Sequence, residues 1–228
     1  MGTDLPTTTI VEFIVGDFEA AWGALAGDRD SGNRGNFMFG LQAVILLEVA
    51  SRLCQSDAKG TAIDAFSAAL ASRDRRYFTA LPSACFEGSK EFRLPHVGPN
   101  PPNQLLAVLF DLIRNGQAHQ YQQIRVRLSD DIDFQVSLTG AEHGMFLDRV
   151  LAAGRPADHL RQSRDENRDL WLRVRTDILY LDVRDSIREA NLLGRGLTLK
   201  HLERPRNSGN QYEFSSTELE SALGGSGH

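Results

Sequence analysis

The segment NFMFGLQAVILLEVASRLCQ, residues 36–55, decides the fold more than any other stretch of the chain. Apolar residues recur at helical spacing along it, and further apolar residues widen the stripe sideways. The stripe comprises Ala43, Leu46, Leu47, Ala50, Leu53 and Cys54, with Leu41, Val44 and Ile45 beside it. A helix that is apolar on most of its circumference is typical of the centre of a bundle. The sequence therefore predicts a central helix over residues 36–55.

Three further segments of the first half show helical periodicity. They cover residues 8–26, 60–72 and about 103–122. The proline-rich stretch PHVGPNPPN, residues 95–103, is a signal for stopping one helix and starting the next, and Asn103 is a suitable N-cap. We therefore expect four helices in the first 124 residues.

The hydrophobic period changes in the second half of the chain. Residues 124–129 and 132–138 alternate apolar and polar side chains around a short acidic turn, which predicts a β-hairpin. Residues 169–174 alternate again and favour a third strand. Residues 143–153 and 176–190 are expected to be helical.

These patterns predict a mainly α fold of the α+β class. We expect a four-helix bundle over residues 1–124, with a β-hairpin and a C-terminal helix over 125–193 packed on the same domain. No linker separates the hairpin from the preceding helix. Residues 194–228 are polar, and we expect a flexible tail there.

Composition narrows the classes of function. The formal charge of −5 argues against a broad basic surface for duplex nucleic acid, but it leaves room for a local phosphate site. The two cysteines, Cys54 and Cys85, are far apart and lack metal-type spacing, which favours free thiols in a reducing compartment. No signal peptide and no membrane span is apparent, so we expect a soluble cytoplasmic protein.

The residues that point to chemistry lie in RNGQAHQY, residues 114–121, in the last turns of the helix predicted over 103–122. Asn115 and His119 are four residues apart and share a helix face, and Arg114 lies beside Asn115. Arginine offers a permanently charged fork for phosphate oxygens, and histidine moves a proton near neutral pH. Because the 2′-hydroxyl of RNA supplies a nucleophile, such a pair suits RNA cleavage without a metal.

One histidine does not easily serve both sides of an in-line displacement, whereas two copies across a two-fold axis do. Arg114, Asn115 and His119 match the R-N-x-x-x-H motif, and their position late in a four-helix bundle resembles the HEPN superfamily (higher eukaryotes and prokaryotes nucleotide-binding domain). Tyr121 extends the match to R-x4-H-x-Y, the form of HEPN toxins paired with minimal nucleotidyltransferase antitoxins. The resemblance covers roughly residues 8–124.

The resemblance implies a homodimer with both motifs at its interface and a metal-independent endoribonuclease activity, in a toxin or a phage-defence effector. It makes Arg114 and His119 catalytic and gives Asn115 a role in shaping the site. Tyr121 becomes a candidate for nucleotidyl transfer by an antitoxin, or for stacking on RNA. Related proteins carry a polar residue from the second helix near the motif, which makes Glu48 a further site-shaping candidate.

Each of these residues also has a plain structural interpretation, and these alternatives stay open. Glu48 is spaced to pair with Arg52 along its helix, which is worth about 0.2–0.5 kcal/mol. Arg114 is spaced to pair with Asp111 in the same way. His119 and Tyr121 are also compatible with simple packing.

We therefore expect a metal-independent endoribonuclease that acts on RNA without a cofactor. His143, His159 and His201 form no metal-ligand set in the sequence, so no metal site is expected. The alternative is a non-catalytic regulatory module of the same fold that binds a nucleotide, an RNA or a protein.

Overall fold

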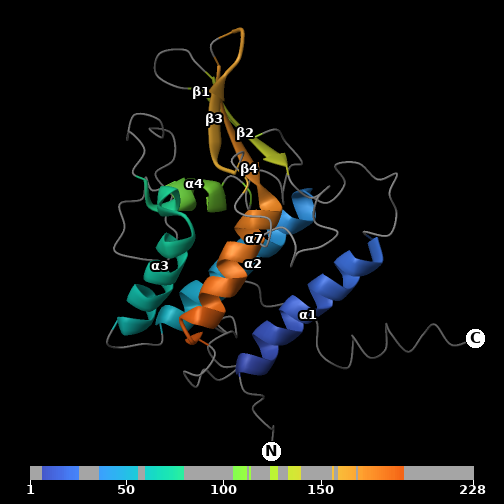
Figure 1. Cartoon of the computed structure of the whole chain (residues 1–228), viewed down its shortest axis with the longest axis vertical. Coiled ribbons are helices and arrows are strands. Elements are labelled where there is room, and N and C mark those ends of the chain that lie inside the picture. Colours follow the sequence, from blue (N-terminus) through green and yellow to red (C-terminus); the bar gives the residue numbers. More distant parts are fainter. Residues whose placement is uncertain are drawn as a thin grey trace, which may run out of the picture.

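The structure is a computed structural model, and its described part is mainly helical with one small sheet (Figure 1). The described residues are 7–25, 36–55, 60–79, 105–111, 113, 124–127, 133–139, 156, 159–167 and 169–192. The helices are α1 (Thr7–Leu25), α2 (Asn36–Gln55), α3 (Thr61–Arg73), the 3₁₀ helix η1 (Arg75–Phe78), α4 (Leu105–Asp111) and α7 (Thr176–Glu189). The strands are β1 (Ile124–Arg127), β2 (Asp133–Thr139), β3 (Arg161–Arg164) and β4 (Leu170–Arg175). This content confirms the α+β class.

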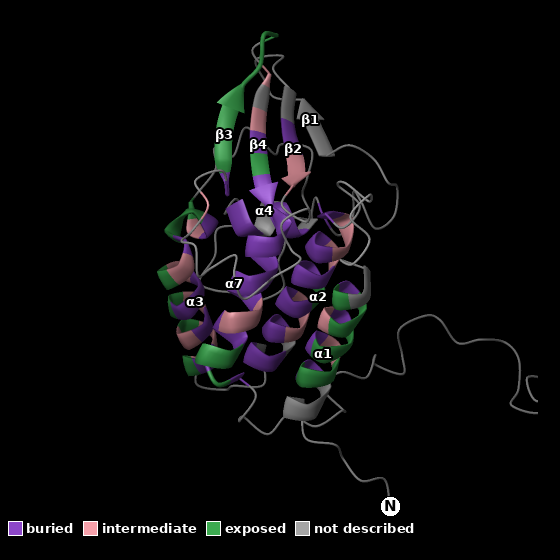
Figure 2. Cartoon of the chain, turned by 45° about the vertical axis from the view of Figure 1, so that its right-hand side comes forward, coloured by how far each residue is buried: buried purple, intermediate pink, exposed green. Residues whose placement is uncertain are grey.

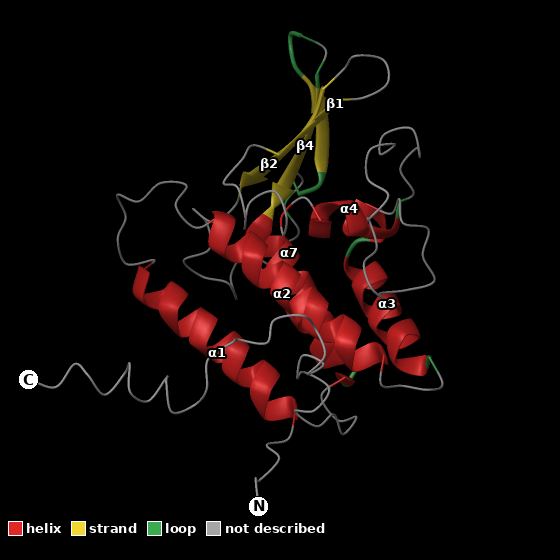
Figure 3. Cartoon of the chain, turned by 180° about the vertical axis from the view of Figure 1, so that it is seen from behind, coloured by secondary structure: helices red, strands yellow, loops and turns green. Residues whose placement is uncertain are grey.

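Helices α2 and α7 form the centre of the molecule. They run side by side with their N-terminal ends beneath the sheet, and α1 and α3 flank them on opposite sides (Figure 3). Every residue of α7 from Thr176 to Val183 is buried, and burial of apolar side chains is the main favourable contribution to folding (Figure 2). The helix at the end of the segment 125–193 is thus part of the core.

The fourth helix of the bundle predicted for residues 1–124 is described only over Leu105–Asp111 and at Ile113. This short α4 contacts η1 and lies between α3 and the sheet (Figure 3). The described helices packed around α2 are therefore α1, α3 and α7, and the four-helix bundle of residues 1–124 stays a prediction. The helix expected over 143–153 lies outside the described residues.

An aromatic cluster joins α1, α2 and α7 in the core. The ring of Phe39 lies 5.1 Å from that of Phe18, 4.4 Å from that of Trp22 and 5.7 Å from that of Tyr180. Such edge-to-face and tilted arrangements contribute about 0.5–1.5 kcal/mol per pair beyond burial. The cluster explains why the helix predicted over 36–55 occupies the centre.

The sheet has the strand order β1-β2-β4-β3 and is mixed. Strands β1 and β2 pair antiparallel, with Val126 opposite Phe134, which confirms the predicted hairpin. Strands β2 and β4 pair parallel, and β3 pairs antiparallel with β4. The sequence did not predict β3, because Arg-Gln-Ser-Arg has no apolar alternation and all four residues are exposed at the sheet edge (Figure 2).

Candidate functional site

The residues of the motif, Arg114, Asn115, His119 and Tyr121, lie outside the described residues. The residue before them, Ile113, is described and fully buried. A Cβ atom built on Gly40 of α2 would lie 3.4 Å from Cγ2 of Ile113. Such an atom would be in ordinary van der Waals contact with Ile113, so Ile113 packs close to the backbone of α2 at this position.

Two more elements meet at the same point. The Cβ position of Gly40 lies 3.5 Å from Leu138 Cδ1 of β2 and 3.6 Å from Thr176 Cγ2 of α7. We call the contact of Gly40, Ile113, Leu138 and Thr176 the Gly40 junction. It fixes the residue that precedes Arg114 at the end of the bundle that adjoins the sheet.

Polar contacts hold the α7 side of this junction. The hydroxyl of Thr176 donates a hydrogen bond to the Thr139 carbonyl oxygen at 3.2 Å. The buried Arg175 donates through Nε and Nη2 to the two carboxylate oxygens of Asp177, at 3.2 and 2.5 Å. A carboxylate in the first turn of a helix also interacts favourably with the helix dipole. The strand β4 thus passes into α7 without a loop and without an uncompensated charge.

Glu48 lies on α2 and is half-buried. It is eight residues beyond Gly40, which corresponds to about 12 Å along the helix axis. The structure thus places Glu48 and the Gly40 junction on one helix but well apart. The side chain of Arg52 is not among those described, and a role for Glu48 beside Arg114 or His119 stays a prediction.

The structure brings together three polar residues that the sequence patterns did not connect. The Tyr77 hydroxyl donates to Oδ2 of Asp182 at 2.6 Å and lies 2.8 Å from Nε2 of His159. Since the hydroxyl has a single proton, the second contact requires a donor on Nε2 of His159. Tyr77 and His159 are 0% exposed and Asp182 is 1% exposed. The hydrogen bonds of this buried cluster tie η1 and the turn before β3 to α7.

One signal in the sequence pointed to this cluster. Asp182 interrupts the apolar run ILYLDV of α7, and a buried carboxylate needs hydrogen-bond donors. The identity of those donors was not accessible, because Tyr77 and His159 are 105 and 23 residues away in the chain.

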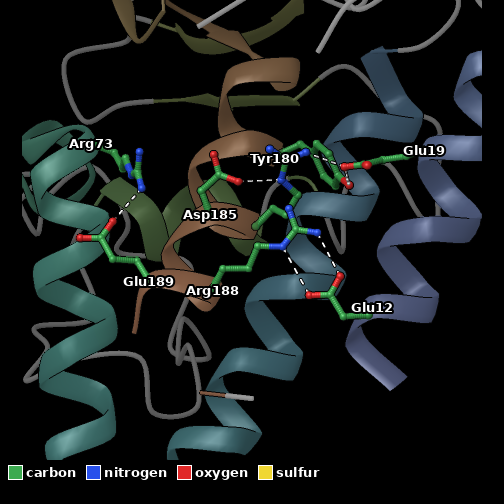
Figure 4. A network of polar contacts seen from close by, with 8 residues as sticks. Glu12, Glu19, Arg73, Tyr180, Asp185, Arg188 and Glu189 are labelled. Atoms are coloured by element: carbon green, nitrogen blue, oxygen red, sulfur yellow. Dashed lines mark hydrogen bonds and ion pairs between the residues drawn. The ribbon is translucent and has the colours of Figure 1, made fainter. Parts of the chain in front are cut away.

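A second polar network joins α1 to α7 (Figure 4). Arg184 donates to Glu19 at 2.6 Å and to Asp185 at 2.7 Å, and Tyr180 donates to Glu19 at 3.0 Å. Burial, with the charge of Glu19, raises the pKa of Tyr180 far above its ordinary value. Burial alone would lower the pKa of Arg184, but the hydrogen bonds to Asp185 and Glu19 raise it. Both residues therefore keep their protons, and the network serves to orient the helices.

Two outer ion pairs extend this network. Arg188 of α7 bonds Glu12 of α1 at 3.0 Å, and Arg73 of α3 bonds Glu189 of α7 at 2.7 Å. The pairs Glu12–Arg188 and Glu19–Arg184 show that α1 runs antiparallel to α7. Arg73, Arg184 and Arg188 are thus each paired with a glutamate of a neighbouring helix.

Comparisons with family models, with curated proteins and with solved structures gave no match for this chain. Within the described ranges, no group of three or more His, Cys, Asp and Glu side chains is placed to hold a metal ion. None of the helices in the described part combines the length and the apolar character that a membrane crossing requires. Functional inference therefore rests on the residues themselves.

Proposed function

We propose that this protein is a HEPN-type endoribonuclease that cleaves RNA without a metal ion. The observation that carries the proposal is the sequence Arg114-Asn115-x3-His119 directly after the buried Ile113. A mainly helical fold is compatible with it, and so is the packing of Ile113 at the Gly40 junction. Because helices and the sheet hold Ile113, a site that begins at the next residue is easier to preorganise than a site on a loop without such support.

In the proposed mechanism, His119 removes the proton of a 2′-hydroxyl, whose oxygen attacks the adjacent phosphorus. The bond from phosphorus to the 5′-oxygen breaks, and that oxygen takes a proton from His119 of the partner subunit. The products are a 2′,3′-cyclic phosphate and a 5′-hydroxyl. Arg114 neutralises the charge that develops on the phosphate oxygens, and Asn115 shapes the site. Two subunits are needed because acid and base act on opposite sides of the phosphorus.

The test is cleavage of bulk RNA by the purified protein in the presence of a chelator. We expect the parent to cleave, and we expect Arg114→Ala and His119→Ala each to lower the rate by about 100-fold or more. Size-exclusion chromatography with light scattering should report the same dimer for the parent and for both variants. Arg75→Ala, which removes an exposed arginine of η1, is the matched control and should keep the parental rate.

Two outcomes would overturn this mechanism. Equal cleavage by the parent and by the Arg114→Ala/His119→Ala double variant would show that the motif is not the source of the activity. Binding of RNA by the parent without any cleavage would instead favour the non-catalytic module of the same fold.

The second part of the proposal is that the protein is a toxin, and it is based on Tyr121. In co-expression with a minimal nucleotidyltransferase antitoxin, Tyr121 would receive a nucleotidyl group on its hydroxyl. Intact-mass measurement should show the added nucleotide mass on the parent and not on Tyr121→Phe. An unmodified parent would remove the antitoxin part of the proposal and leave the nuclease part untouched.

A further inference from the structure

Two arginines stand directly opposite each other on the β3–β4 hairpin. Arg161 of β3 pairs with Arg173 of β4 in the antiparallel register, and both side chains are exposed. Directly opposite residues have their Cβ atoms about 4.5–5.5 Å apart on one face of the sheet, and like charges there are destabilising. Such a pair calls for an explanation.

Neither guanidinium has a carboxylate partner among the described residues. The contrast with other described arginines is clear. Arg73, Arg76, Arg175, Arg184 and Arg188 each form an ion pair with an acidic side chain. Arg75 of η1 also has no carboxylate partner among the described residues, but Arg161 and Arg173 differ from it because they lie directly opposite each other.

An aromatic ring lies two residues from Arg173 on the same face. Trp171 pairs with Ser163 of β3 and is half-buried. Its indole Nε1 donates to Oδ2 of Asp165 at 3.0 Å, which fixes the edge of the ring. Among the described residues, no aromatic ring or cation packs on the indole.

The turn between the strands holds Asp165 in place for this contact. Oδ1 of Asp165 accepts hydrogen bonds from the backbone N–H groups of Asn167 and Asp169, both at 2.9 Å. The hydrogen bond from Trp171, together with these backbone bonds, lowers the pKa of the Asp165 carboxyl. The carboxylate stays charged at neutral pH, and the indole is therefore oriented before any ligand arrives.

The opposite face of the sheet belongs to the core. Val136, Leu172 and Val174 are buried there, whereas Ser163, Trp171 and Arg173 alternate to the other side. We call Arg161, Ser163, Trp171 and Arg173 the β3–β4 face. The β3–β4 hairpin that carries this face projects from the end of the bundle (Figure 2).

We propose that the β3–β4 face binds single-stranded RNA, with Arg161 and Arg173 on phosphates and a base stacked on Trp171. Arginine forks match phosphate geometry, and aromatic stacking combined with cations is how proteins bind single strands. A duplex is disfavoured, because it needs a broad basic surface and the chain carries a net charge of −5. The proposal rests on the proposed function, for which this face would hold the RNA that the motif cleaves.

The test is binding of a fluorescein-labelled single-stranded RNA 12-mer, followed by anisotropy in the presence of a chelator. The protein carries His119→Ala so that the RNA stays intact. We expect Arg161→Ala/Arg173→Ala to weaken binding by about 10-fold or more. Because two phosphate contacts are removed, the slope of log K against log salt should become shallower by about 1.4.

Substitutions of Trp171 separate stacking from folding. Trp171→Ala should weaken binding by about 5-fold to 140-fold without changing the salt slope, as the loss of one stacked base requires. Trp171→Phe loses the bond to Asp165 but keeps an aromatic face, and it should keep most of the affinity. Arg75→Ala is the matched arginine control and should bind like the parent. Circular dichroism should show the same fold for all variants.

Three results would overturn this proposal. The first is that the parent does not bind RNA. The second is that the double arginine variant keeps the parental affinity and salt slope. The third is that polyglutamate competes as strongly as RNA, which would indicate an acidic protein partner. These results are distinct from failure of the nuclease. A parent that binds RNA through this face but never cleaves it would refute the nuclease alone.

Discussion

The buried cluster of Tyr77, His159 and Asp182 and the exposed β3–β4 face treat polar groups in opposite ways. In the cluster, the hydroxyl of Tyr77 bridges the imidazole and the carboxylate, and water is excluded. On the face, two guanidinium groups stand opposite each other with no described carboxylate between them. Hydrogen bonding between buried groups stabilises the fold, whereas uncompensated charge on the surface is available to a ligand.

The largest expected effect comes from a substitution in the buried cluster. Asp182→Ala removes the acceptor of the Tyr77 hydroxyl and leaves buried polar groups without their partner, so the free energy of unfolding should fall by about 3 kcal/mol. Urea denaturation followed by circular dichroism measures this change. Tyr77→Phe removes only the hydroxyl and should also be destabilising. A loss below about 0.5 kcal/mol for Asp182→Ala would show that the cluster does not hold η1 on α7.

The Gly40 junction offers a second test, because it links core packing to the proposed site. Gly40→Val adds branched bulk where even a Cβ atom lies 3.4 Å from Ile113, and overpacking of this kind costs about 1–3 kcal/mol. Displacement of Ile113 should also lower RNA cleavage. The control is Gly16→Ala on α1, where a Cβ meets nothing within 4 Å, and it should stabilise by about 0.5–1 kcal/mol. Parental stability and cleavage in Gly40→Val would contradict the role of the junction.

The smallest expected effect on stability comes from a substitution on the exposed β3–β4 face. Arg161→Glu replaces a like-charge pair by an opposite-charge pair with Arg173, and it should stabilise the protein by about 0.2–1 kcal/mol. The same change should weaken RNA binding, because it removes one phosphate contact and adds a repulsive charge. Thermal melts and anisotropy check the two effects. Reduced stability together with unchanged RNA binding would show that the arginine pair serves the fold.

Much of the fold could be predicted from periodicity. The helix expected over 36–55 matches α2, and those expected over 8–26, 60–72 and 176–190 match α1, α3 and α7 within one residue at each end. The strand expected over 169–174 is β4, shifted by one residue. Local patterns suffice here because each element buries one regular stripe of side chains.

The contacts between elements could not be predicted from local sequence patterns. The edge strand β3 has no apolar residues and is defined only by its pairing with β4. The central place of α7 depends on its contacts with α2 and α3. The candidate motif was found from Arg114, Asn115 and His119 as residue types at a given spacing. The Gly40 junction, which includes Ile113 just before the motif, joins segments far apart in the chain, and no local pattern connects them.

The most direct test of the central claim compares one RNA with the DNA of the same sequence in the presence of a chelator. The proposed chemistry needs the 2′-hydroxyl as nucleophile, so the RNA should be cut to products that end in a 2′,3′-cyclic phosphate. The DNA should stay intact, and His119→Ala should leave both uncut. Cleavage of the DNA at a comparable rate, or an unchanged RNA pattern with His119→Ala, would contradict the assignment.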